Sequence, residues 1–164
     1  MARAPVPKSH SASFFVPLFL YCFIFAFTAC HTVPLPPLNL SEPGWKLREG
    51  QAVWRSGKKA SEIAGELQLA THPDGRVWLQ FTKTPIPLVV GQVTATHWQI
   101  QFVPQNRMYR GPGRPPARLS WLQLARAISG SSTPPAWSWQ TKPDGSWRLE
   151  NLATGEVIEG YLAP

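Results

Sequence analysis

The sequence predicts a mainly β fold, a curved antiparallel meander or incomplete barrel of about nine strands covered by a short helix. Three observations lead to this fold class. Apolar and polar residues alternate over much of the chain after Trp45, as in residues 98–102, where Trp98, Ile100 and Phe102 share one face. Asp-Gly turns at residues 74–75 and 144–145 separate two pairs of these runs. A single segment has helical spacing instead.

The strands follow from the alternating runs in chain order. The Pro-Asp-Gly turn at residues 73–75 recurs at 143–145, and the differing flanks indicate reused hairpin chemistry rather than a duplicated domain. Pro85 and Pro87 remove ladder donors, so we expect a bend or a sheet edge there. The expected strands lie near residues 46–56, 61–71, 76–83, 86–94, 97–103, 106–110, 136–141, 146–151 and 156–162.

The helical segment is residues 118–129. Its apolar stripe consists of Leu119, Leu122, Ala125 and Ile128, spaced at three and four residues. Two prolines precede it, where proline is tolerated, and a glycine follows it. We expect this helix to lie across the apolar face of the sheet.

Residues 1–29 have the layout of an export signal. Arg3 and Lys8 form a basic, acid-free leader, and the apolar stretch at 14–27 is too short to span a bilayer comfortably. Residues 27–30, Phe-Thr-Ala-Cys, resemble the bacterial lipobox, which implies cleavage before Cys30 and a covalent lipid on its thiol. The alternative is a plain signal peptide or short membrane anchor in which Cys30 is incidental.

Removal of the signal peptide sets the organisation of the mature chain, residues 30–164. Cys30 is then the only cysteine, so one domain, residues 45–164, must fold without an internal disulfide. The proline-rich segment at 30–44 is expected to act as a tether reaching about 40 Å, at ~3.1 Å per residue. Its leucines make it more apolar than a typical linker, so part of it can lie on the domain.

The mature chain is basic, with 14 Lys and Arg against nine Asp and Glu. For an exported, acylated protein, an anionic membrane or lipid headgroup is a better partner for this charge than nucleic acid. A solvated basic face without a ligand is the other interpretation. The acid-free stretch at 107–126 carries Arg107, Arg110, Arg114, Arg118 and Arg126.

The helix between the sixth strand and a final three-strand unit resembles the LolA and LolB lipoprotein carriers. The similar stretches are residues 65–69, residues 98–102 followed by Tyr109, and residues 119–128, and the resemblance covers roughly 45–162. It implies an incomplete barrel that receives acyl chains of lipids or other lipoproteins, with Arg107 and Arg110 contacting headgroups. The expected lining residues are Trp78, Phe81, Trp98, Ile100, Phe102, Trp121, Trp137 and Trp139.

The carrier interpretation has one alternative. The same aromatic residues can simply form a filled core, and the chain is then a structural or assembly lipoprotein that binds an envelope protein or peptidoglycan fragment.

His31 after Cys30, rather than Asp, favours the outer membrane facing the periplasm under the common enterobacterial sorting rule.

Catalysis finds little support in the sequence. His31, His72 and His97 have no partners at metal-ligand spacing, and Glu156 and Glu159 are expected on opposite faces of a strand. We therefore expect no enzyme activity, no metal, no cofactor beyond the lipid on Cys30, no nucleic-acid partner, and a monomer.

Overall fold

Nine antiparallel strands, one α-helix and a 3-10 turn form the regular structure of residues 34–163, the part that the computed structural model describes. Every strand lies within two residues of its predicted bounds, so the predicted elements are confirmed. The strands are β1 (Lys46–Arg55), β2 (Ile63–Thr71), β3 (Val77–Lys83), β4 (Ile86–Val93), β5 (His97–Phe102), β6 (Arg107–Pro112), β7 (Trp137–Thr141), β8 (Ser146–Asn151) and β9 (Val157–Leu162).

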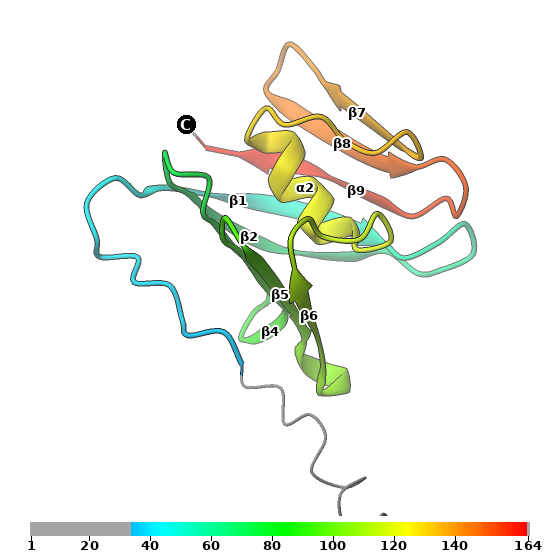
Figure 1. The fold of residues 1–164 in the computed structure, drawn as a ribbon. Helices are drawn as coiled ribbons and strands as arrows, with labels where there is room; N and C mark the ends of the chain where they lie inside the picture. Colours follow the sequence, from blue (N-terminus) through cyan, green and yellow to red (C-terminus); the bar gives the residue numbers. More distant parts are fainter. Residues whose placement is uncertain (1–33, 164) are drawn as a thin grey trace, which may run out of the picture. The chain divides into compact units, whose positions relative to one another are not determined.

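All nine strands belong to one sheet in the order β6-β5-β4-β3-β2-β1-β9-β8-β7. The chain therefore makes two meanders, β1 to β6 and β7 to β9, which join where β9 pairs antiparallel with β1. Strands β6 and β7 are the two free edges, so the sheet does not close. Figure 1 shows the strands curving around the helix. The mainly β, incomplete-barrel fold class is confirmed.

The two faces of the sheet differ in chemistry. The face that we call inner carries Leu67, Leu69, Leu79, Phe81 and Ile100, which are all buried. Paired strands keep these residues level, since Leu67 is opposite Phe81 and Leu69 opposite Leu79. The other face, the outer face, carries the intervening and mostly polar positions, as the period-two pattern predicts.

Helix α2 (Ser120–Ile128) lies across the inner face. Seven of its nine residues are buried, including Trp121, Leu122 and Leu124. At its C-terminus the Gly130 N–H donates to Ala127 O and the Ser131 N–H to Arg126 O, which satisfies carbonyls that the helix leaves free. The predicted helix is confirmed, shorter by two residues at its start and one at its end.

The two Pro-Asp-Gly sequences form the same hairpin turn. Gly75 donates its N–H to His72 O, and Gly145 donates to Lys142 O, each at 3.0 Å. Both glycines have positive φ, 89° and 81°, a region that L-residues with a Cβ rarely adopt. Reuse of one local turn solution, rather than domain duplication, explains the echo.

The predicted irregularity at the prolines of residues 85–87 is a bend and not an edge. Strand β4 starts at Ile86 and lies between β3 and β5 inside the sheet. The register of β3 and β4 shifts between Phe81 and Thr82, which brings Pro87 opposite Thr82. A bulge there accommodates a residue that cannot donate to the ladder.

Residues 35–45, which we call the N-terminal strap, start on the outer face and end beside the turn between β2 and β3. The Leu35 N–H donates to Gln99 Oε1 at 2.8 Å, and Gln92 Nε2 donates to Pro36 O at 3.2 Å. The compact unit therefore begins at Leu35 and not at the predicted position 45. Only the part of the predicted tether before Leu35 is left outside this unit.

Candidate functional site

Side chains of helix α2 occupy the space between helix and inner face. Trp121 is fully buried, and its ring stacks on Phe81 with centroids 4.7 Å apart. The Trp54 ring meets the same indole edge-on at 5.7 Å. Leu122 and Leu124 are also fully buried. The inside of the half-barrel is thus packed by protein side chains in this structure.

The predicted lining residues fall into three groups. Phe81, Trp98, Ile100, Trp121 and Trp137 are buried in one core cluster. Phe102 and Trp139 are half-buried and pack against that cluster, Trp139 beside Trp147 with ring centroids 5.9 Å apart. The structure therefore brings seven of the eight predicted side chains together as core, and Trp78 forms the third group.

Trp78 lies on the outer face, which corrects its place in the predicted lining set. Val77 and Leu79, its neighbours in β3, are buried on the inner face, and strict alternation sends Trp78 to the other side. There it lines a small groove of about 180 Å³ with Leu35 and Leu38 of the strap. The indole of Trp78 therefore lies beside the strap on the outer face.

A cleft of about 460 Å³ opens between the C-terminal end of α2 and the sheet. Its apolar floor includes Val77, Val93 and Ala125, and Lys46 and Arg126 line it as well. Arg126 is held there by hydrogen bonds to Gln123 and Ser132 O. An amphiphile with an anionic head would find an apolar surface beside cationic groups in this cleft. None of the predicted aromatic residues lines it.

Glu156 is a partly buried carboxyl near the N-terminal end of α2. It accepts a hydrogen bond from Trp54 Nε1 at 2.9 Å. Burial raises the pKa of Glu156, and hydrogen bonds from Ser120 and Trp54 only partly oppose this effect. Glu159 points instead to the outer face, where it pairs with Arg148, so the expectation of opposite faces is confirmed. A lone Glu provides no spacing signal from which this burial could have been predicted.

The largest pocket of the three we consider, about 610 Å³, lies on the outer face. Gln51, Thr82, Arg148 and Tyr161 line it together with Lys142. Burial lowers the pKa of the Arg148 guanidinium, but its ion pairs with Glu159 and Glu150 outweigh burial and raise that pKa. Such a surface suits a polar partner better than an acyl chain. No sequence pattern indicated this pocket, because its residues come from several separate segments of the chain.

The two predicted headgroup-contacting arginines lie on edge strand β6. Arg107 is opposite Phe102 and so belongs to the inner face, whereas Arg110 is opposite Gln99 and belongs to the outer face. Arg107 is exposed, and Arg110 is half-buried with a buried Nη1 that has no hydrogen-bond partner among residues 34–163. They do not converge on the interior of the half-barrel.

The histidines of the described chain have structural partners. His72 contacts Pro43 O and Asp74, and the Trp45 ring lies 5.2 Å from it. His97 contacts the Thr96 hydroxyl at 2.9 Å. Within residues 34–163, no three His, Cys, Asp or Glu side chains lie close enough to hold a metal ion. The predicted leader, Cys30 and His31 lie outside the described residues.

No family model and no curated protein matches this sequence. The structure also has no helix, between residues 34 and 163, with the length and apolarity needed to cross a bilayer.

Proposed function

We propose that the chain is a non-catalytic lipoprotein of the bacterial envelope, anchored through Cys30 in the outer membrane and facing the periplasm, whose folded domain binds partners at its surface. The observation that carries this proposal is the packed half-barrel, with Trp121 stacked on Phe81 and enclosed by the core. A side chain in that position leaves no room for a resident acyl chain. The residues that surround the 610 Å³ outer pocket remain accessible to a polar envelope partner, a protein or a peptidoglycan fragment.

The anchor is tested by mass spectrometry of the mature N-terminus. We expect an acyl mass on Cys30 of the wild type. The Cys30→Ala variant should not be acylated and should be lost from the membrane fraction. The packed interior is tested on the same preparation by native mass spectrometry and titration with a fluorescent fatty acid. No co-purified lipid and no saturable binding are expected. An unacylated wild type would overturn the anchor, and a stoichiometric lipid would overturn the packed interior.

A second candidate is an acyl-chain carrier or receptor resembling LolB, and the cleft at the end of α2 favours it. Loading would require α2 to move away from the sheet. Exposing one Trp and two Leu side chains costs roughly 10 kcal/mol at ~25 cal/mol per Å², whereas burying about 16 methylenes contributes roughly 13 kcal/mol at ~0.8 each. The cost of exposing the helix side chains and the gain from burying the methylenes are similar, so an acyl chain can replace the helix only if it enters the half-barrel completely.

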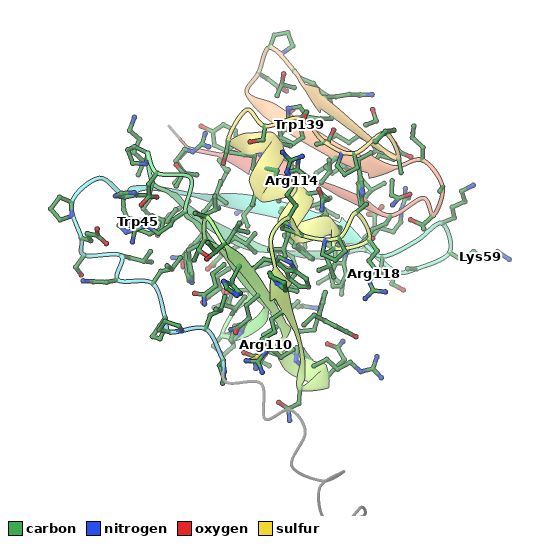
Figure 2. All side chains as sticks on the ribbon, in the orientation of Figure 1. Trp45, Lys59, Arg110, Arg114, Arg118 and Trp139 are labelled. Carbon is green, nitrogen blue, oxygen red and sulfur yellow. The ribbon has the colours of Figure 1, made fainter. Side chains whose placement is uncertain are left out.

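The carrier proposal makes its own prediction at the cleft. Arg126→Gln, which removes one cation from the cleft, should weaken binding of a fluorescent fatty acid several-fold if the carboxylate lies there. Lys59→Gln, in the loop between β1 and β2 and outside the cleft lining (Figure 2), removes the same charge and is the matched control that should have no effect. Equal binding by both variants would argue against the cleft as the entry site.

A further inference from the structure

The strap shortens the distance between the anchor and the folded domain. Among the described residues, side-chain contacts with the domain begin at Leu35, five residues after Cys30. Five residues span at most about 17 Å even when fully extended, at ~3.3–3.6 Å each. A free tether up to residue 44 would reach about 40 Å. The strap therefore holds the domain against the bilayer that carries the lipid, which rests on the proposed acylation of Cys30.

The strap also determines which part of the domain is near the anchor. Leu35 hydrogen-bonds to Gln99 on the outer face of β5, and Gln99 pairs with Arg110 of the edge strand β6. The chain thus leaves the folded unit one strand away from the free edge. At its other end the strap is fixed by Glu42, which accepts two hydrogen bonds from Arg76 at 2.9 and 3.0 Å.

The chemistry of β6 suits a lipid headgroup layer. Arg107 and Arg110 project from opposite faces of the edge strand, and neither forms an ion pair with another residue of the described chain. Between them Met108 is 40% exposed and Tyr109 38% exposed. Cationic groups flanking an exposed apolar and aromatic pair are typical of side chains at a membrane interface.

The charge distribution along the chain supports the same surface. No Asp or Glu occurs between Asp74 and Asp144, a stretch that includes β3 to β6 and α2. Every acidic residue of the chain lies at or outside these two positions. Arg114 and Arg118 extend the positive charge into the loop that follows β6 (Figure 2). The edge next to the anchor is therefore the acid-free side of the sheet.

We infer that residues 107–118, edge strand β6 and the loop after it, form a membrane-facing surface that binds anionic phospholipid headgroups of the bilayer in which Cys30 is anchored. The surface orients the domain with β6 toward the membrane. The 610 Å³ pocket near the opposite part of the sheet, between β3 and β8, is then left for a periplasmic partner.

The lipid affinity is tested with a chain that starts at His31, which keeps the whole compact unit and lacks the acyl group. It is sedimented with vesicles of phosphatidylcholine alone or of phosphatidylcholine and phosphatidylglycerol mixed two to one. Each Arg near such a surface contributes about fivefold, so the double variant Arg107→Glu/Arg110→Glu should bind at least roughly 30-fold more weakly. The control Lys58→Glu/Lys59→Glu makes the same change in net charge in the loop between β1 and β2, away from β6 (Figure 2 labels Lys59), and should bind like wild type.

The orientation is tested in the acylated protein, where a single introduced thiol can be labelled because Cys30 is blocked. An environment-sensitive fluorophore at Met108→Cys should be quenched by lipid-borne quenchers, whereas the same label at Leu152→Cys, a 63% exposed site after β8, should not. Any of three results would overturn the inference: equal weakening of vesicle binding by both charge variants, no preference for anionic vesicles, or equal quenching at both labelled positions. So would self-association that Arg107→Glu/Arg110→Glu abolishes without a change in vesicle binding. Loss of the acyl mass alone would overturn the anchor and leave the sedimentation result standing.

Discussion

Replacement of Trp121 by Ala is the most direct test of how the half-barrel is packed. The side chain is fully buried between α2 and the sheet, with Phe81 stacked at 4.7 Å and Trp54 edge-on at 5.7 Å. Truncation of a buried Trp costs about 3–5 kcal/mol, and both aromatic contacts are lost, so we expect the free energy of unfolding to fall by about 4 kcal/mol. For a domain of this size that lowers Tm by roughly 12–20 °C.

The assay is thermal unfolding followed by far-UV circular dichroism, which does not depend on the fluorescence of the residue removed. Trp121→Phe keeps the stacking on Phe81 and removes an indole Nε1 that has no hydrogen-bond partner among the described residues. The free energy of unfolding of Trp121→Phe should therefore fall much less, by about 1 kcal/mol. Trp139→Ala, at a half-buried site on edge strand β7, should cost about half as much as Trp121→Ala.

The size of the effect decides between a packed core and a cavity. A loss below about 1 kcal/mol for Trp121→Ala would mean that the indole does not stabilise the fold, and the proposed filled interior would be refuted. A large loss accompanied by new binding of a fluorescent fatty acid would show that the space is apolar but occupied by Trp121 in the wild type.

Three further predictions concern other sites. Because the pKa of Glu156 is raised on folding, the free energy of unfolding should fall as pH rises from about 4.3, the ordinary pKa of Glu, through the raised pKa. In urea titrations, Glu156→Gln should flatten this pH dependence and should be more stable than the wild type at pH 7. Gly160→Ala should destabilise strongly, by more than about 2 kcal/mol in the same titrations, because a Cβ there would overlap Gln51 O of the paired strand β1. Removal of the Glu42–Arg76 pair by Glu42→Gln should release the strap, seen as faster amide exchange at residues 35–45, with little change in Tm because the pair is exposed.

Matched controls keep each prediction specific. Glu62→Gln removes an exposed carboxylate that pairs loosely with Arg55 and is the control for the loss of one negative charge. At Gly57 a Cβ would meet only an atom 3.9 Å away, so Gly57→Ala should be nearly neutral. An unchanged pH slope in Glu156→Gln, a neutral Gly160→Ala, or slow exchange of the strap in Glu42→Gln would each contradict the corresponding argument.

Most of the fold could be predicted from the sequence, because the information that specifies it is local. Period-two alternation specifies strands wherever one face is buried, and the turn at residues 73–75 specifies its hairpin through a glycine at positive φ. The stripe on α2 likewise predicted both its span and the face it buries. The leader and the expectation for Cys30 are also local patterns, and they remain predictions.

The roles of the aromatic residues and of the proline-rich segment were visible only in the folded chain. Alternation defines two faces but does not say what covers each, and the strap covers Trp78 while Trp121 fills the half-barrel. The outer pocket and the burial of Glu156 depend on contacts between residues distant in the chain, such as Trp54 with Glu156. Pairing of β9 with β1 creates these contacts, and no local propensity encodes it. Long-range packing therefore determined whether a Trp-rich sheet encloses a pocket or a core.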